Sequence, residues 1–346
     1  MSGTGSLRWG VIGYGRFGQL HAAAIARGPA TELAAVATAS AATAALARSH
    51  HPDAAVTTDW QKLVDDPGID VVDIVAPNHL HAAMALRALE AGKHVLVEKP
   101  LATTLADCDL LVEAVDRTGG LLSVGFELRL SVQWRRIKEL IDEGRIGRPG
   151  FVHVALFRHP YRPGASGWRH APGEVGSWIL EEPVHFYDLA MWYLAASGEP
   201  VAVNAQGTAG REPGLLDNLV STVRFGDGAL AVVSQTLAGF GHHLVVEVVG
   251  TEGAMRATWS AGHAASTEPS FDLHVGPIGL EAPERIPLDE PSGEIFELEK
   301  QIGLTNAAFQ AGRTLVDVRE GRRAVVVCLE AERSVREGRE VPFHFA

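Results

Sequence analysis

Three glycines near the start of the chain have a spacing that suits a phosphate group. Gly13, Gly15 and Gly18 form a G-x-G-x-x-G motif between an apolar run and a helical pattern. The first glycine permits a tight turn, the second lets the backbone approach a pyrophosphate, and the third allows close helix–strand packing. The start of the helix adds free N–H groups and the positive end of its dipole. The motif predicts a dinucleotide site, and we expect Arg16 and Phe17 of the same loop to contact the cofactor.

The residues that follow the next predicted strand bear on the type of dinucleotide. An acidic residue about 20 positions past the motif normally binds the ribose hydroxyls of NAD. Here Thr38, Ala39 and Ser40 occupy that region. This segment contains no carboxylate that would repel the 2′-phosphate of NADP, and no arginine stands next to it to bind that phosphate. We expect Thr38 and Ser40 to line the ribose, with NAD as the cofactor and NADP possible.

Lys99 lies in a Glu-Lys-Pro segment directly after the apolar run 95–97, which is predicted to be a strand. Ligands of parallel sheets bind beyond the carboxyl ends of the strands, so Lys99 is expected to reach the nicotinamide side. An ordinary surface lysine is the alternative. A buried strand before Lys99 and the rigid Pro100 after it favour the functional interpretation.

These residues must be positioned by the N-terminal third, where short apolar runs alternate with helical patterns. Strands are predicted at 7–12, 33–37, 71–76, 95–97 and 121–124, and helices at 17–27, 40–48, 79–91 and 105–117. The run 71–76 is apolar except for one Asp, as expected for a strand that is buried on both faces. Strand–helix alternation of this kind predicts a doubly wound parallel sheet, a Rossmann domain over residues 1–125.

The pattern changes after about residue 125. Strand-like runs at 151–157, 219–225, 230–237 and 244–249 are combined with helical patterns at 132–143, 295–314 and 322–336. In 219–225, apolar residues alternate with Thr222 and Arg224, which is typical of a half-exposed antiparallel strand. Residues 126–346 are predicted to form an α+β domain with an open, mostly antiparallel sheet, for substrate binding and oligomerisation.

Composition excludes several classes of protein. The length of 346 residues fits two domains at roughly 150 residues each. With 46% hydrophobic and 21% charged residues, the chain is neither disordered nor a coiled coil. Its net charge of −12 makes nucleic acid and anionic membranes improbable partners.

The two cysteines, Cys108 and Cys328, are too few and too far apart for a disulfide framework or a thiolate zinc site. No apolar run reaches the roughly 18 residues of a membrane span. The N-terminus lacks a signal-peptide pattern, so we expect a cytoplasmic protein.

Several segments in order along the chain resemble the Gfo/Idh/MocA family of NAD(P)-dependent oxidoreductases. Besides the glycine motif these are PNHLH at 77–81, AGKHVLVEKP at 91–100, GFELR at 125–129, GWR at 167–169 and VHFYD at 184–188. In that family the lysine of E-K-P and a D-x-x-x-H pair form the catalytic site. The resemblance implies catalytic roles for Lys99 and His185.

The acidic partner departs from the family pattern. Glu181 stands four residues before His185, where the family has Asp, and Pro183 replaces the usual Gly. On one continuous helix Glu181 and His185 would share a face. A proline is tolerated in a first helical turn but kinks a helix interior, so the helix either begins near Pro183 or bends there.

The chemistry of these side chains agrees with the resemblance. An imidazole with a pKa near 6.5 can take the proton of a secondary alcohol, which is the role expected of His185. The ammonium group of Lys99 would stabilise the developing alkoxide. Glu181 would orient the imidazole or bind a substrate hydroxyl. The alternative for His185 is a buried histidine satisfied by a helix partner.

Further residues are expected around the two ligands. Pro77, Asn78, His81 and Glu98 would contact the cofactor, although Asn78 could simply cap a helix. Around a polyhydroxylated or anionic substrate we expect Arg129, Trp168, Arg169, Glu182 and His185; ion pairing and aromatic packing are the alternative for these arginines and the tryptophan. His242 and His243 lie between predicted strands and could reach the substrate, but exposed loop histidines are the more common case. No metal is expected, because the 15 histidines show no ligand spacing at the site.

Together these observations predict an enzyme that moves a hydride between NAD(P) and a secondary hydroxyl or ketone of a sugar, inositol or related polyol. We expect a homodimer or homotetramer formed through the second domain. Two alternatives remain: an NAD-dependent glycosidase of the same family, and a sugar or nucleotide sensor without catalysis. Release of an aglycone without NADH would indicate the glycosidase, whereas intact Lys99 and His185 argue against the sensor.

Overall fold

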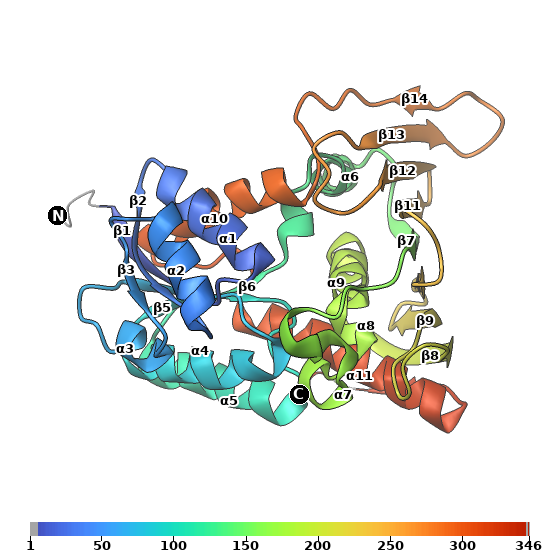
Figure 1. The fold of residues 1–346 in the computed structure, drawn as a ribbon. Helices are drawn as coiled ribbons and strands as arrows, with labels where there is room; N and C mark the ends of the chain where they lie inside the picture. Colours follow the sequence, from blue (N-terminus) through green and yellow to red (C-terminus); the bar gives the residue numbers. More distant parts are fainter. Residues whose placement is uncertain (1–5, 344, 346) are drawn as a thin grey trace. The chain divides into compact units, whose positions relative to one another are not determined.

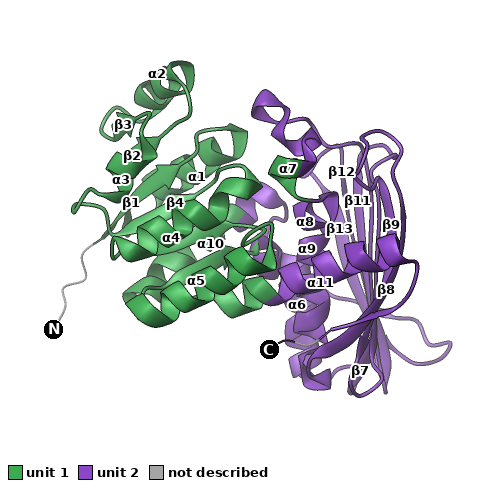
Figure 2. Cartoon of the chain, turned by 90° about the horizontal axis from the view of Figure 1, so that it is seen from below, with its two compact units in different colours: residues 1–126, 173–176, 298–322 green, residues 127–172, 177–297, 323–346 purple. Residues whose placement is uncertain are grey.

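The chain was analysed as a computed structural model, which describes residues 6–343 and 345. It divides into two compact units (Figure 2). Unit 1 contains the chain up to Phe126 together with 173–176 and 298–322; unit 2 contains 127–172, 177–297 and the rest from Arg323. The sequence-based division placed its single boundary after residue 125 and did not include the two later segments in the first domain.

Unit 1 is built on a six-stranded sheet in the order β3-β2-β1-β4-β5-β6, with every neighbouring pair parallel (Figure 1). The strands are β1 Leu7–Ile12, β2 Thr31–Ala37, β3 Ala55–Thr57, β4 Val71–Ile74, β5 His94–Glu98 and β6 Leu122–Gly125. The helices that begin in its N-terminal segment are α1 Arg16–Arg27, α2 Ala41–His50, α3 Trp60–Val64, α4 His81–Glu90 and α5 Leu105–Thr118. The strand order reverses between β1 and β4, as in a Rossmann fold, which confirms the predicted fold class.

Helix α10, Glu294–Gln310, explains why a distant segment belongs to unit 1. Its Leu298, Ile302 and Phe309 are buried in the same core as Trp9 of β1. The Trp9 indole also donates a hydrogen bond of 3.1 Å to the Asn306 side chain. Helical periodicity predicted this helix but could not reveal which core its apolar face joins.

Unit 2 is built on a nine-stranded sheet in the order β14-β13-β12-β11-β7-β10-β9-β8-β15. Among the neighbouring strand pairs described in this nine-stranded sheet, only β7–β10 is parallel. The predicted open, mostly antiparallel sheet is therefore confirmed. The strands are β7 Pro149–Arg158, β8 Pro200–Thr208, β9 Asn218–Phe225, β10 Leu230–Thr236, β11 His242–Gly250, β12 Gly253–Ala261, β13 Ser270–Pro277, β14 Glu284–Arg285 and β15 Val341–Pro342.

Helix α9, Pro183–Tyr193, covers the inner face of this sheet by packing on β7 and β10. The inward residues of β7 are Val152, Val154 and Leu156, which are all buried. Helix α6, Val132–Asp142, packs in turn against α9. The remaining helices are α7 Pro172–Val175, α8 Trp178–Glu181 and α11 Val318–Glu337, and α11 runs from unit 1 into unit 2. Most of the α9 side chains are therefore buried, including His185, which the sequence predicts to be catalytic.

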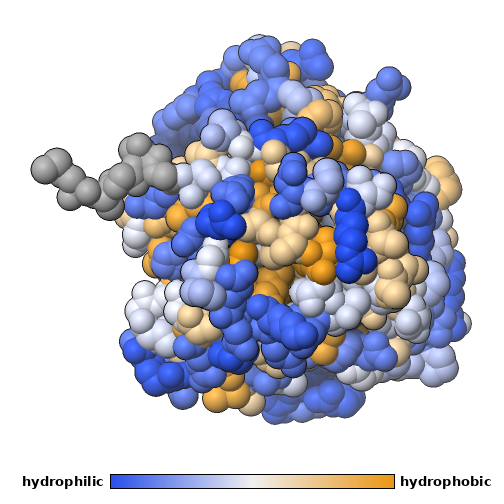
Figure 3. Space-filling model, turned by 60° about the vertical axis from the view of Figure 1, so that its left-hand side comes forward, coloured by the Kyte–Doolittle hydropathy of each residue, from blue (hydrophilic) through white to orange (hydrophobic). Residues whose placement is uncertain are grey.

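The surface agrees with the acidic, mixed composition. Figure 3 shows one face on which hydrophilic residues predominate and hydrophobic residues are exposed among them. Of the helices in the described residues, none has the length and apolarity needed to cross a bilayer. Cys108 and Cys328 are both buried as free thiols.

Candidate active site

The glycine loop between β1 and α1 is shaped by close backbone contacts. Gly13 has a φ of 104°, and a Cβ at this position would lie 2.1 Å from the carbonyl oxygen of Val75. A Cβ on Gly18 would lie 2.1 Å from the Gly13 carbonyl oxygen. At Gly15, by contrast, an added Cβ meets nothing within 4 Å. Gly13 and Gly18 are thus required for folding of the loop, whereas Gly15 leaves open space where a phosphate can approach the backbone.

Helix α1 begins directly after this open position. Gly15 is its N-cap and supplies no side-chain hydrogen bond to the first turn, which starts at Arg16. Backbone N–H groups of a first helical turn have no partner within the helix and favour an anion. The loop and the helix start therefore fit the pyrophosphate of a dinucleotide.

Thr38 and Ser40 follow β2 and are both engaged in local hydrogen bonds. The Thr38 hydroxyl donates to the Ser40 carbonyl oxygen at 3.0 Å, and the Ser40 hydroxyl accepts from the Thr43 N–H at 3.2 Å to cap α2. Neither residue carries a charge. Contact of these hydroxyls with a cofactor ribose remains a prediction.

The segment after β4 fixes its own backbone. Pro77 precedes a short 3₁₀ helix, Asn78–Leu80, and the Asn78 amide donates to the Val175 carbonyl oxygen at 3.1 Å. The His81 ring lies 2.7 Å from the Pro100 carbonyl oxygen and 2.8 Å from that of Ala76. Burial lowers the pKa of His81, and its contacts with these two backbone carbonyls oppose that shift. His81 thus braces the backbone beside Lys99, and direct cofactor contact by these residues remains a prediction.

A buried charge cluster lies beneath the glycine loop. His21 of α1 has Nδ1 2.8 Å from an Asp73 oxygen and Nε2 3.4 Å from a Glu98 oxygen, and the His21 ring is fully buried. Burial alone would lower the pKa of His21, but the charges and hydrogen bonds of Asp73 and Glu98 raise it to about 10. His21 is therefore an imidazolium that joins α1, β4 and β5. The Glu98 carboxylate faces this histidine, while Lys99 at the end of β5 is partly exposed.

In unit 2 the helical structure is interrupted between Glu181 and His185. Helix α8 ends at Glu181, and Glu182 has a non-helical φ of −136°. Helix α9 then begins with Pro183 in its first turn, where the missing proline N–H costs nothing. Of the two possibilities left by the sequence, the helix starts at Pro183. Glu181 and His185 consequently do not belong to one continuous helix.

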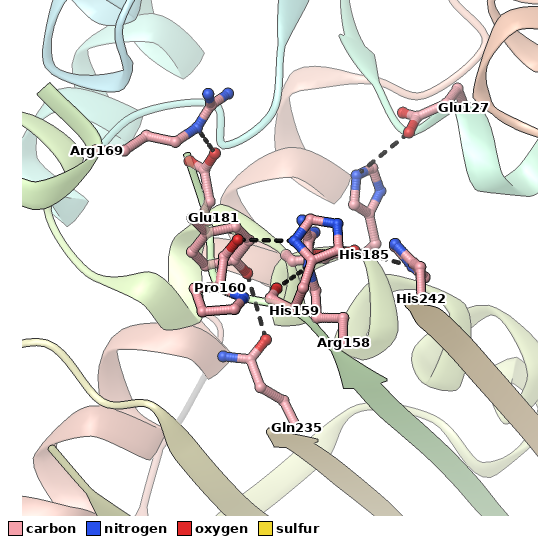
Figure 4. Close-up of polar contacts among 11 residues, drawn as sticks. Glu127, Arg158, His159, Pro160, Arg169, Glu181, His185, Gln235 and His242 are labelled. Atoms are coloured by element: carbon pink, nitrogen blue, oxygen red, sulfur yellow. Dashed lines mark hydrogen bonds and ion pairs between the residues drawn. The ribbon is translucent and has the colours of Figure 1, made fainter. Parts of the chain in front are cut away.

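The two glutamates at this interruption are each bound by an arginine, and Figure 4 shows the pair of Glu181 with Arg169. Glu181 pairs with Arg169, whose guanidinium lies 4.6 Å from the centre of the Trp168 ring. Glu182 pairs with Arg158 of β7. The predicted substrate residues Trp168, Arg169 and Glu182 thus belong to one polar cluster with Glu181.

His242 adds to this cluster. Its Nε2 lies 3.5 Å from a Glu182 oxygen, and only 7% of the side chain is exposed. Burial lowers the pKa of His242 to about 4 despite the opposing charge of Glu182. The expectation of an exposed loop histidine is wrong for His242, because it starts β11 and faces the inner side of the sheet. His243 is exposed as expected, but it lies in β11 and not in a loop.

His185 meets a different carboxylate. Its Nε2 lies 3.4 Å from an oxygen of Glu127, and both side chains are more than nine-tenths buried (Figure 4). Glu127 opens a short 3₁₀ helix, Glu127–Leu130. Glu127 lies within the GFELR segment at 125–129 and was not among the predicted site residues. An acidic residue inside a family segment was the one signal available.

Arg129, two residues further on, is held by a bidentate ion pair. Its Nε and Nη2 donate to the two oxygens of Asp188 at 2.8 and 2.7 Å. The guanidinium also lies 5.4 Å from the centre of the Trp192 ring. The ion-pair alternative considered for Arg129 is therefore present, and substrate binding by this residue remains a prediction. No group of three or more His, Cys, Asp or Glu side chains in the described part of the chain is arranged to hold a metal ion.

Replacement of His21 tests the buried cluster. A raised pKa means that His21 contributes stability that is complete below pH 6.5 and is lost as the pH rises through about 10. We expect His21→Gln to lower the free energy of unfolding at pH 7 by about 3–5 kcal/mol. Denaturant unfolding at pH 7 and pH 10.5 should show this difference shrinking at the higher pH. The exposed His243→Gln serves as control, and a difference that is constant with pH would refute the charge assignment.

Comparison with protein families gives two matches. Residues 7–126 match the oxidoreductase family model with an NAD-binding Rossmann fold, GFO_IDH_MocA, and residues 134–256 match a GFO/IDH/MocA C-terminal domain.

Individual proteins agree with these matches. The 1,5-anhydro-D-fructose reductase of Ensifer adhaerens is 33% identical over 72% of this chain and 74% of its own length. The scyllo-inositol 2-dehydrogenase (NAD(+)) of Bacillus subtilis is 32% identical over 57% of each chain. The solved aldose-aldose oxidoreductase of Caulobacter crescentus superimposes with a TM-score of 0.82 at 22% identity, covering 98% of this chain and all of its own. The chain belongs to the Gfo/Idh/MocA family of oxidoreductases.

Proposed function

We propose that this protein is an NAD-dependent dehydrogenase that interconverts a secondary hydroxyl and a ketone on a sugar, inositol or related polyol. The observation that carries the proposal is His185, a buried imidazole paired with a carboxylate on the family's catalytic motif. The relatives named above act on substrates of this class by their names. No feature of the site favours the glycosidase or the sensor.

The dinucleotide would be held by the glycine loop of unit 1. Gly15 and the start of α1 suit its pyrophosphate, and Thr38, Ser40, Pro77, Asn78 and His81 are the proposed contacts along its length. When bound, NAD accepts the hydride from the carbon that carries the hydroxyl group. The uncharged residues after β2 support NAD and leave NADP possible.

His185 is the proposed acid–base residue, which takes the hydroxyl proton during oxidation and returns it during reduction. The Lys99 ammonium would donate a hydrogen bond to the same oxygen and stabilise its developing negative charge. Because Glu181 is paired with Arg169, we propose that it binds a substrate hydroxyl rather than the imidazole. Trp168, Arg169, Glu182 and Arg129 complete the proposed substrate surroundings.

Removal of either proposed catalytic group should abolish turnover. We expect Lys99→Ala and His185→Ala each to lower kcat at least about 100-fold, the usual range for general acid–base groups. NADH affinity, measured by fluorescence titration, should change little. The assay is a screen of NAD and NADP reduction across sugars, inositols and glycosides, with aglycone release followed in parallel. Near wild-type kcat in either variant would show that the roles are misassigned.

Alanine at two positions of the glycine loop should separate binding from folding. Because a Cβ at Gly15 meets no protein atom, Gly15→Ala should fold normally but keep the phosphate from the backbone. We expect its Kd for NADH to rise at least about tenfold, or about 1.4 kcal/mol. Gly18→Ala should instead lower the melting temperature, since its Cβ would clash with Gly13. Gly173→Ala, with open space outside the loop, is the control, and unchanged NADH affinity of Gly15→Ala would contradict this site.

We further propose a cytoplasmic homodimer or homotetramer that assembles through the outer face of the nine-stranded sheet. Phe157 and Phe240 pack edge to face on this side with ring centres 5.3 Å apart, and Phe240 is 82% exposed. Val220 and Val249 are also exposed. Apolar residues on an open sheet favour association with a second copy.

The oligomer can be tested by light scattering after gel filtration. We expect a wild-type mass of two or four chains, and a shift towards the monomer in Phe240→Lys combined with Val249→Lys, because buried lysines would oppose association. Leu110→Lys, at an exposed position of α5, should leave the mass unchanged. A monomeric wild type would exclude the proposed assembly.

A further inference from the structure

The acidic neighbour of His185 comes from outside its own helix. Glu127 is the first residue of unit 2, and its Oε1 lies 3.4 Å from the His185 Nε2. The two residues are 58 positions apart in the sequence, and only 9% of the Glu127 side chain and 5% of the His185 side chain are exposed. At this burial an imidazole–carboxylate pair is little screened by solvent.

The glutamate at the family's acidic position cannot serve His185 in the usual way. Glu181 ends α8, and the non-helical Glu182 separates it from α9. Its carboxylate is committed to the Arg169 guanidinium, which is itself stacked on Trp168. Charge-assisted pairs with arginine are among the strongest that a carboxylate forms, so Glu181 is fixed to the arginine.

The other charged groups around His185 in unit 2 are likewise engaged with one another. Glu182, at the same break, pairs with Arg158 of β7 and lies close to the neutral His242 of β11. Asp188, one turn further along α9, is bound by both nitrogens of Arg129. Each of these acidic residues forms an ion pair with an arginine, and Glu127 forms one with His185.

We propose that Glu127 is the positioning residue of His185 and takes the place that the family's motif gives to the acid four residues earlier. The contact between Nε2 and the Glu127 carboxylate holds the ring in one orientation. During oxidation the ring accepts the proton of the substrate hydroxyl: the O–H bond breaks, an N–H bond forms, and the ring becomes an imidazolium. The Glu127 carboxylate stabilises the resulting imidazolium. This assignment rests on the proposed function in one respect: the proposed function supplies the substrate hydroxyl that gives up the proton.

The test compares Glu127→Gln with Glu181→Gln in the full-length protein. Both changes remove one carboxylate and keep the side-chain size, so each is the control for the other. Titration of the histidine Cε1–H NMR signals, with His185→Gln for assignment, measures the His185 pKa without any turnover. The pH profile of kcat/KM with NAD and the best polyol of the screen gives the second readout.

We expect Glu127→Gln to lower the His185 pKa by about one unit or more and to move the acidic limb of kcat/KM to lower pH by the same amount. Its kcat should fall at least about tenfold, because the ring loses the carboxylate that orients it. In Glu181→Gln the His185 pKa should stay within about 0.3 units, while KM rises through loss of the substrate contact. Glu127→Asp retains the charge and should restore most of the pKa.

An unchanged His185 titration in Glu127→Gln, or the larger shift in Glu181→Gln, would overturn the proposal. If Glu127→Gln does not fold, Glu127→Met removes the same charge and must give the same shift against Glu127→Asp. The NMR result stands apart from the enzymatic one. A wild type that is inactive on every polyol would refute the proposed function, whereas an active enzyme with an unchanged titration would refute the role of Glu127.

Discussion

An ionised side chain that leaves water must meet an opposite charge, and this constraint organises the interior of both units. In unit 1 the His21 imidazolium is bound by Asp73 and Glu98 and thereby joins a helix to two strands. In unit 2 Arg129, Arg158 and Arg169 each hold one carboxylate near α9. These pairs contribute less to net stability than to a single arrangement of the site, because any exchange of partners would leave a charge buried alone.

The break before Pro183 determines how these pairs are distributed. A proline in the middle of a helix would leave a carbonyl without its donor, so the chain begins a new helix at that residue. Glu181 and Glu182 therefore lie outside the regular part of α9. They form ion pairs with arginines of two other segments. His185, near the start of α9, is met instead by Glu127. The two departures from the family pattern, Glu181 and Pro183, thus occur together with a proposed catalytic base that meets Glu127.

The Rossmann unit was predictable because its signals are local. Buried parallel strands read as continuous apolar runs, and the glycine spacing marks the loop even though Gly13 meets the distant Val75 carbonyl. The strands 200–208, 253–261 and 270–277 were missed, since they are half exposed and carry polar residues and glycines. The assignment of 298–322 to unit 1 was also missed, because a helical pattern shows that a face is buried but not against which sheet.

The fold class, the family, the dinucleotide loop and the candidates Lys99 and His185 were predictable from residue type and spacing, which specify these features directly. The sequence also identified Pro183 as the point at which the helical pattern had to change. Only the folded structure shows that Glu127 contacts His185, that Arg169 forms an ion pair with Glu181, and that His242 is buried beside Glu182. These partners lie 12 to 60 positions apart in the chain, and their meeting depends on how loops, helices and strands pack, which no local pattern specifies.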